Sequence, residues 1–296
     1  MNKNQTSITL SAPAKINFTL DVLSRRPDGY HDLSTIMQAV SLADTVTVDA
    51  VRAEETTVQL TTDKSFLPTD DRNIACKAAK AFLESAGITA AVKIDLQKQI
   101  PVGAGMGGGS SDAAAVLRAL AALLQVELPP ETMNRLAKSI GADVPFALDG
   151  GCALAEGIGE VLKPLPVFTG IPLVICKPRA SVATKSIFTR FRVDAVAEHP
   201  DTAGALSAIR GRNLSALAFR LFNVLEPVTS ELCPPIAEYR RALLKAGALG
   251  TVMTGSGTAV FGIFADRAAA ETAEKLLKPQ CDFVWCAETI GPNPQL

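Results

Sequence analysis

The chain has 296 residues, which at roughly 150 residues per domain predicts about two domains. Hydrophobic residues make up 48% and charged residues 20%, as in an ordinary soluble globular protein. The formal net charge of −1 excludes the strongly basic character of nucleic-acid-binding or anionic-membrane-binding proteins, so we expect neither partner. Composition does not indicate an oligomeric state.

The N-terminal sequence lacks the apolar run of a signal peptide, and no window approaches the ~20 apolar residues that span a bilayer. Six cysteines occur without a CxxC pair, and the chain has only two histidines. These counts disfavour a structural zinc site and a disulfide framework. We therefore expect a cytoplasmic protein with reduced, buried thiols.

In chain order, apolar and polar residues alternate first in the stretch 7–24, which predicts a strand. Its apolar face carries Ile16, Phe18, Leu20 and Val22, and its polar face carries Lys15, Asn17, Thr19 and Asp21. Further strands are predicted at 44–50, 56–62 and 91–97, the last with Val92, Ile94 and Leu96 on one face. Helices are predicted at 73–87, between Asn73 as N-cap and Gly87 as stop, from the serines at 110–111 to about 126, and at 130–141.

The segment "KPLPVFTGIP" (163–172) contains three prolines and a glycine, which predicts a domain boundary. We place the two domains at 1–167 and 168–296. In the second half, strands are predicted at 172–178 and 282–288 and on both sides of a glycine turn within 251–266. Helices are predicted at 214–225, 234–247 and 267–277.

The stretch "PVGAGMGGGSSDAAAVLR" (101–118) places five glycines among seven residues in front of a helix. Glycine permits positive φ, and a run of glycines can direct several N–H groups into one anion-binding concavity. Ser110, Ser111 and Asp112 are natural N-caps, so we expect the helix to start there and to add its N-terminal N–H groups. These features together predict a phosphate-binding loop.

This loop has three other interpretations. A Walker loop requires a lysine before the serine, and Gly109 stands there instead. Gly103, Gly105 and Gly108 satisfy GxGxxG, but a dinucleotide-binding unit also needs a second strand ending in an acid ~20 residues on, where this chain has a helix leading into "ELPPE". A flexible turn without a ligand remains the third alternative.

The glycine loop "PVGAGMGGGSSDAA" resembles the second motif of the GHMP kinases, which are small-molecule kinases without a Walker lysine. Three other stretches resemble motifs of this family in the same order, across residues 12–262: "APAKINFTLDV", "RPDGYHDL" and "TGSGTAVFG". Met106 stands where leucine is usual, and Thr254 where serine is usual. The resemblance is closest to the branch whose substrate carries a cytidine diphosphate.

The resemblance implies an α+β fold of two lobes: an N-terminal nucleotide-binding lobe and a C-terminal ferredoxin-like lobe, with the active site in the cleft between them. It implies ATP as phosphoryl donor, accompanied by Mg²⁺. The implied reaction transfers the γ-phosphoryl group to the 2-hydroxyl of a methylerythritol unit that carries a cytidine diphosphate, giving the 2-phosphate and ADP in non-mevalonate isoprenoid precursor biosynthesis.

The resemblance also assigns catalytic roles to Lys15 and Asp143. Asp143 follows a predicted helix end, where the helix dipole disfavours a carboxylate, so mere stability does not explain it. A lysine beside it would keep the carboxylate ionised and stabilise charge on an attacking oxygen. The ATP-binding residues implied by the resemblance, with Ser111 also a candidate Mg²⁺ contact, are Pro101, Val102, Gly103, Ala104, Gly105, Met106, Gly107, Gly108, Gly109, Ser110 and Ser111.

For the second substrate, Tyr30 and His31 match the family's cytosine-binding residues, with the tyrosine ring for stacking and the histidine for hydrogen bonding to the base edge. The other substrate-binding candidates are Asn17, Phe188, Gly255, Ser256 and Gly257. Structural alternatives are an exposed strand face for Lys15 and Asn17, an apolar helix face for Phe188, and a plain hairpin turn for the second glycine loop.

Two other functions are alternatives to this one. A GHMP kinase for homoserine-type or mevalonate-type substrates would give the Tyr30–His31 pair no base to bind. A nucleotide-binding module without catalysis would not need both Lys15 and Asp143.

Overall fold

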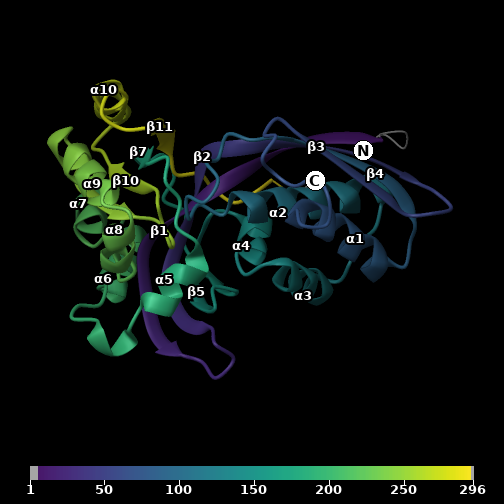
Figure 1. Ribbon diagram of the computed structural model, residues 1–296, viewed down its shortest axis with the longest axis horizontal. Helices are drawn as coiled ribbons and strands as arrows, with labels where there is room; N and C mark the ends of the chain where they lie inside the picture. Colours follow the sequence, from purple (N-terminus) through teal and green to yellow (C-terminus); the bar gives the residue numbers. More distant parts are fainter. Residues whose placement is uncertain (1–5, 295–296) are drawn as a thin grey trace.

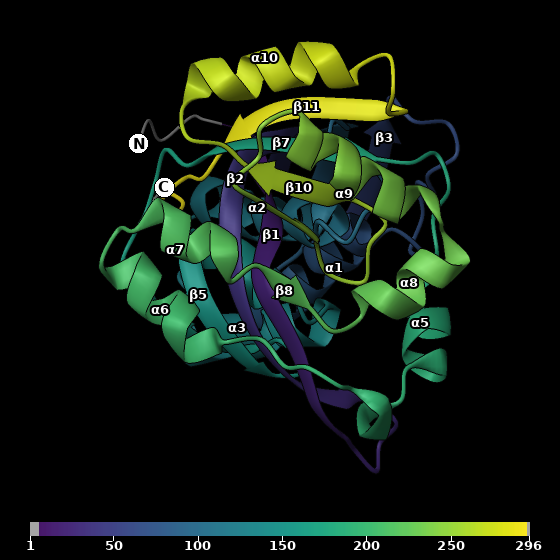
Figure 2. The ribbon, with the colours of Figure 1, turned by 90° about the vertical axis from the view of Figure 1, so that its left-hand side faces the viewer.

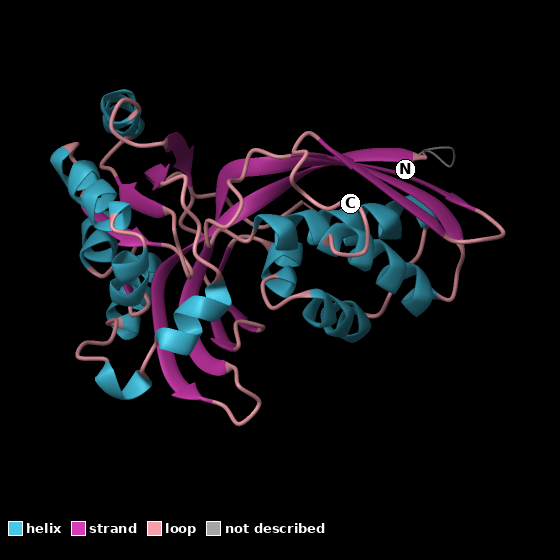
Figure 3. Cartoon of the chain, viewed as in Figure 1, coloured by secondary structure: helices cyan, strands magenta, loops and turns pink. Residues whose placement is uncertain are grey.

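The structure is a computed structural model that describes residues 6–294 (Figure 1). The N-terminal half forms a sheet with helices on one face (Figure 3). Its strands are β1 (Ser7–Arg25), β2 (His31–Arg52), β3 (Thr57–Thr62), β4 (Ala90–Gln97), β5 (Cys152–Gly157) and β6 (Val161–Pro164). Its helices are α1 (Ile74–Ala86), α2 (Gly108–Leu124), α3 (Pro130–Ile140) and α4 (Val144–Asp149).

Strand β2 is the branching point of this sheet. The strand order is β3-β4-β2-β1-β8, where β8 (Phe222–Asn223) comes from the second half. Strand β5 pairs with the first part of β2, and β4 pairs with its last part. The alternation predicted for β4 is confirmed, because Val92, Ile94 and Leu96 are buried. They pack with α1 and α2 in one hydrophobic core. The long β1–β2 ladder extends beyond this core toward the second lobe (Figure 1).

Two helix starts show how local capping decides a boundary. The prediction for α1 is confirmed: the Asn73 side chain accepts from the Ala75 N–H, and Gly87 ends the helix in the left-handed conformation. The predicted start of α2 is wrong by two to three residues. The helix begins at Gly108 after Gly107, whose φ of +72° turns the chain directly into the helix without a side-chain cap.

The second half supplies a four-stranded antiparallel sheet and seven helices among the described residues. The strands of this sheet are β7 (Pro172–Lys177), β9 (Gly250–Met253), β10 (Val260–Ile263) and β11 (Phe283–Glu288), while β8 (Phe222–Asn223) joins the first sheet. The helices are α5 (Thr184–Arg190), η1 (Val193–Ala195, a 3₁₀ turn), α6 (Thr202–Arg210), α7 (Leu214–Phe219), α8 (Glu226–Leu232), α9 (Pro235–Lys245) and α10 (Arg267–Leu277).

The sheet order β11-β7-β10-β9 is that of a split βαβ, ferredoxin-like unit, so the expected α+β class and second lobe are confirmed. Alternate residues of β7 point to opposite cores. Val174 and Cys176 pack with α9 and α10, which lie over one face of this sheet (Figure 2). Leu173 and Ile175 pack in a core shared with β1, α6 and α7.

The helix predicted at 214–225 is wrong in its second half. Helix α7 ends at Phe219, and β8 pairs in parallel with β1 at Thr19 and Leu20. The side chain of Asn223 donates to the carbonyls of Met253 and Gly255, at 2.8 Å each. These long-range bonds override the local helical periodicity. The division at 167/168 stays a prediction, although β8 completes the sheet of the first half.

The six cysteines are all free, five of them buried and Cys286 half-buried. Between residues 6 and 294, the structure contains no helix with the length and hydropathy needed to cross a bilayer.

Candidate active site

A cavity of about 1100 Å³ collects most of the predicted site residues. Its walls come from β1, β2, the glycine loop, the residues before α4, α5 and the second glycine loop. The predicted residues that line it are Lys15, Asn17, Tyr30, His31, Gly105, Gly107, Ser110, Asp143, Phe188, Gly255 and Ser256. The other predicted ATP-loop and substrate residues lie outside its lining: Pro101, Val102, Gly103, Ala104, Met106, Gly108, Gly109, Ser111 and Gly257.

At one end of the cavity, the Lys15 Nζ lies 3.7 Å from Asp143 Oδ2 and 2.9 Å from Asn17 Oδ1. The polar face of β1 is buried here: Lys15 is 6% and Asn17 2% exposed, so the alternative of a solvated strand face is wrong. Buried charges need a partner, and these two contacts supply it. The arrangement places a cation and a carboxylate side by side at the cavity wall.

Asp143 does follow the end of α3, as predicted, but it also directly precedes α4. A carboxylate before a helix commonly caps it, and the argument from an unfavourable dipole therefore does not hold. The Asp143 side chain makes no capping hydrogen bond, however, and faces Lys15 instead. Its carboxylate is thus left available to the cavity.

The Asn17 amide is fixed from three sides. Its Nδ2 donates to the Thr35 hydroxyl at 2.8 Å, and its Oδ1 accepts from the Thr254 hydroxyl at 3.1 Å as well as from Lys15. The Thr254 hydroxyl also accepts from the Asn17 backbone N–H at 3.0 Å. Threonine at position 254 therefore supplies the hydroxyl that the usual serine would bring, and it connects the second glycine loop to β1.

The two glycine loops pack directly against each other. A Cβ on Gly105 (φ +75°) would lie 2.3 Å from the Thr254 carbonyl oxygen, and a Cβ on Gly255 (φ +57°) would lie 2.6 Å from the Gly105 carbonyl oxygen. Neither contact tolerates a side chain, so glycine is required at both positions. Gly107 (φ +72°) is less crowded, because its hypothetical Cβ would lie 3.2 Å from the Cγ of the Lys15 side chain.

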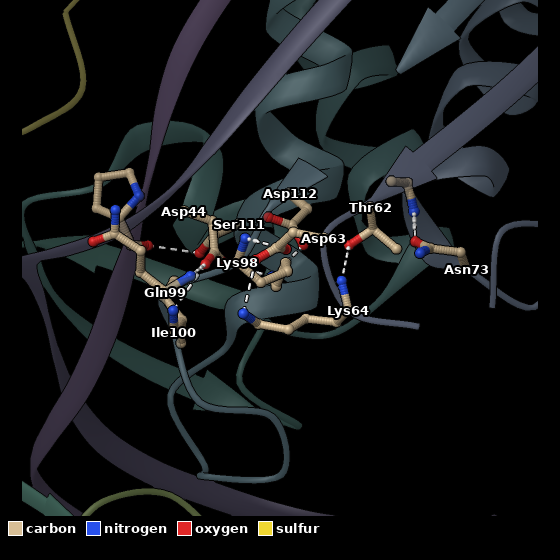
Figure 4. A network of polar contacts seen from close by, with 12 residues as sticks. Asp44, Thr62, Asp63, Lys64, Asn73, Lys98, Gln99, Ile100, Ser111 and Asp112 are labelled. Atoms are coloured by element: carbon tan, nitrogen blue, oxygen red, sulfur yellow. Dashed lines mark hydrogen bonds and ion pairs between the residues drawn. The ribbon is translucent and has the colours of Figure 1, made fainter. Parts of the chain in front are cut away.

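A buried group of three charges lies where the chain enters and leaves the glycine loop (Figure 4). Lys98 Nζ donates to the carboxylates of both Asp44 and Asp112, and all three side chains are at most 4% exposed. Asp44 Oδ1 also accepts from the backbone N–H groups of Gln99 and Ile100, at 2.6 and 2.8 Å, immediately before the loop. Burial raises the pKa of Asp112 to about 7, with the Asp44 charge acting in the same direction and Lys98 opposing it.

At the other end of the cavity lie the predicted base-binding residues. Tyr30 is 60% exposed on the turn between β1 and β2, and the rings of His31 and Phe188 lie 5.0 Å apart. Burial, assisted by the charge of Arg25, lowers the pKa of His31. The imidazole is therefore neutral at pH 7 and offers one donor and one acceptor nitrogen, as an edge-reading residue requires.

Several residues of the site were not predicted from the sequence. Lys185 and Thr184 of α5 and Arg25 line the cavity, and Thr184 shares a hydrogen bond with the Ser256 hydroxyl at 2.8 Å. Asn223 fixes the second glycine loop from β8. These residues lie outside the four motifs, and only the three-dimensional fold brings them to the site.

The metal candidate Ser111 is turned away from the cavity, because its hydroxyl donates to the Pro13 carbonyl at 2.6 Å. Ser110, one residue earlier, lines the cavity. The part of the chain that the structure describes holds no group of three or more His, Cys, Asp or Glu side chains able to bind a metal ion by itself.

The family models and the sequence relatives that match this chain indicate the same family. Residues 73–151 match the GHMP kinases N terminal domain, and residues 202–278 match the GHMP kinases C terminal domain. A 4-diphosphocytidyl-2-C-methyl-D-erythritol kinase from Caldicellulosiruptor saccharolyticus is 45% identical over 91% of this chain and 92% of its own length. The kinase of that name from Acetivibrio thermocellus is 40% identical over 92% of this chain and 95% of its own.

Solved structures agree with the sequence relatives. A crystal structure of 4-(cytidine 5′-diphospho)-2C-methyl-D-erythritol kinase, 36% identical, superimposes with a TM-score of 0.81 over 96% of this chain and 100% of that one. A homoserine kinase from Cytophaga hutchinsonii shares the fold at 22% identity, with a TM-score of 0.77 over 99% of this chain and 97% of that one. The chain therefore belongs to the GHMP kinases, in the group of the 4-diphosphocytidyl-2-C-methyl-D-erythritol kinases.

Proposed function

We propose that this chain transfers the γ-phosphoryl group of ATP to the 2-hydroxyl of 4-diphosphocytidyl-2-C-methyl-D-erythritol, in isoprenoid precursor biosynthesis. The observation that carries this proposal is the composition of one cavity. It has the Lys15–Asp143 pair at one end and the Tyr30, His31 and Phe188 rings at the other. A kinase whose substrate carries no nucleobase, such as homoserine or mevalonate, would have nothing to bind to these three rings.

In the proposed reaction the substrate 2-hydroxyl oxygen attacks the γ-phosphorus, and the Asp143 carboxylate accepts the hydroxyl proton. The bond between the γ-phosphorus and the bridging oxygen breaks, and ADP leaves with the electron pair. The Lys15 ammonium stabilises negative charge on the attacking oxygen, and its contact with Asn17 fixes its direction. The two glycine loops present backbone N–H groups to the phosphates.

Mg²⁺ prefers oxygen ligands and is usually held by one or two carboxylates together with substrate phosphates. The cavity offers this type of donor in Asp143 and the Ser110 hydroxyl, while Ser111 is engaged with Pro13. These two residues would contact an ion that arrives with ATP. The ion would supply neutralisation of the phosphate charge.

The test is an ADP-release assay with the cytidyl substrate, homoserine and mevalonate in parallel. We expect turnover with the cytidyl substrate alone. We expect Asp143→Asn to keep the fold and to lower kcat by about 10²–10⁴-fold, the usual loss for a positioned base. Asp70→Asn, at a surface carboxylate paired with Arg72 outside the cavity, is the control and should retain kcat. Near-normal turnover of Asp143→Asn would remove this residue from the mechanism.

A further inference from the structure

The C-terminal segment, residues 289–294, leaves the second lobe and returns to the first. After β11 it runs beside β2, where Thr289 forms a β-bridge with Val40 and the Ile290 N–H donates to the Ala39 carbonyl at 3.0 Å. It then reaches the C-terminal end of α4. Nothing in the reaction described above uses this segment.

Asn293 supplies the hydrogen bonds that the end of α4 needs. Its side-chain Nδ2 donates to the carbonyls of Ala147 and Leu148, at 2.8 and 3.1 Å, and its backbone N–H donates to the carbonyl of Asp149 at 2.8 Å. The last carbonyls of a helix have no partner within the helix. A single residue of the C-terminal segment thus satisfies three of them.

The chain after α4 is shaped to admit this segment. Gly150 and Gly151 both have positive φ, +69° and +70°, and Gly150 forms a β-bridge with Pro292. A Cβ on Gly150 would lie 3.1 Å from the Asn293 backbone N, and a Cβ on Gly151 would lie 3.2 Å from Pro292. Side chains at either glycine would therefore push the segment away from α4.

The other end of α4 carries Asp143. The helix has six residues, so it is only about 9 Å long at ~1.5 Å per residue. So short a helix is marginal by itself and takes its direction from its neighbours. Its N-terminal end has no side-chain cap and is held by packing, because Val144 and Phe146 are buried. The contacts at its C-terminal end hold the other side of the helix, and both ends together set the direction of Asp143 and its 3.7 Å separation from Lys15.

We propose that Asn293 is a positioning residue: by holding the C-terminal end of α4, it sets the place of the Asp143 carboxylate beside Lys15. This inference rests on the proposed function, because it acts through Asp143. The relevant displacement is small, but a misplacement of about 1 Å at a reacting group can cost about 10²-fold in rate.

The test compares two substitutions of Asn293. Asn293→Asp is isosteric but turns a donor into a carboxylate that faces two carbonyl oxygens, and Asn293→Ala removes the side chain. We expect kcat to fall by about 10–100-fold in both, with KM for ATP and for the cytidyl substrate within about twofold of wild type. The control is Asn213→Ala, which removes a helix cap of α7, where the Asn213 side chain accepts from Ala216 N–H at 3.0 Å. Tm is measured for every variant, and kinetics are run well below the lowest Tm.

A purely structural role gives a different result. If the Asn293 variants lower Tm like Asn213→Ala and keep wild-type kcat, the proposal is overturned. If Asn293→Ala does not fold, Asn293→Asp and Gly151→Ala decide the question by the same measurements.

A double-variant cycle separates this inference from the proposed function. With Asp143→Asn already present, the Asn293 substitutions should lower kcat no further, because the group that they misplace is gone. Additive losses would overturn the positioning role while leaving Asp143 in the mechanism. Wild-type turnover of Asp143→Asn alone would instead reject the catalytic role of Asp143, and the role of Asn293 with it.

Discussion

Asp112 should make the stability of this protein depend on pH in a way that one substitution can isolate. Its folded-state pKa, raised by burial to about 7, lies above the value of about 3.9 expected for an unfolded chain. A raised pKa means that the folded state binds the proton more tightly than the unfolded state. The stabilisation is therefore fully present below about pH 4 and is lost as the pH rises through about 7.

Between pH 8 and pH 5 this one group should raise the free energy of unfolding of the wild type by about 3 kcal/mol. Asp112→Asn keeps the size of the side chain and removes the titration. The free energy of unfolding of the variant minus that of the wild type should therefore fall by about 3 kcal/mol over the same interval. Urea unfolding followed by circular dichroism at unit steps from pH 5 to pH 8 measures this difference.

Asp70→Asn is the control for this experiment. Asp70 lies at the surface, and its hydrogen bonds to Arg72 lower its pKa to about 2, so it is ionised in both states throughout the interval. The free energy of unfolding of Asp70→Asn minus that of the wild type should therefore not change with pH. If the corresponding difference for Asp112→Asn is also independent of pH, Asp112 is ionised in the folded protein at pH 5, and Lys98 compensates its burial fully.

Gly107→Val should raise KM for ATP and lower kcat, because φ is +72° and a Cβ would press on Lys15; unchanged ATP kinetics in a folded variant would place the phosphates elsewhere. Gly105→Ala should lower the free energy of unfolding by about 1–3 kcal/mol, since the loops must separate, and an unchanged Tm would contradict this contact. Tyr30→Ala should lower kcat/KM for cytidyl and uridyl substrates alike, because stacking accepts any base. His31→Ala should narrow the preference for cytidyl over uridyl, and a fully retained preference would show that another group reads the base.

The fold was predictable wherever short-range chemistry decides the outcome. The Asn73 cap, the Gly87 stop and the alternation of β4 all depend on residues close in sequence, and all three predictions are confirmed. The start of α2 was wrong because Gly107 can begin a helix by its backbone conformation alone. The helix predicted at 214–225 was wrong in its second half because the Asn223 side chain bonds to a loop some thirty positions later in the chain. Local periodicity carries no information on such a contact.

For the site, the motifs predicted the residues that line the cavity but not the buried residues that hold them in place. Lys15, Asp143, His31 and Phe188 were expected to act together, and the structure places all four around one cavity. Their catalytic and binding roles stay predictions. The Asp44–Lys98–Asp112 cluster joins residues from three separate parts of the chain; Asp112 was predicted only as a helix cap, and the other two were given no role. Only their common burial reveals it.

The β1–β2 ladder acts as a molecular ruler. Lys15 lies on β1, His31 lies at the start of β2, and the two strands pair antiparallel from Ser7 to Arg25, with register shifts at 13/15, 17/19 and 22/24. The distance between Lys15 and His31 is therefore set by backbone hydrogen bonds within a single sheet. Within the proposed function, this distance selects substrates by the length of the linker between the base and the hydroxyl. An analogue with one phosphate fewer would still place its cytosine beside His31, but its hydroxyl would stop short of Lys15.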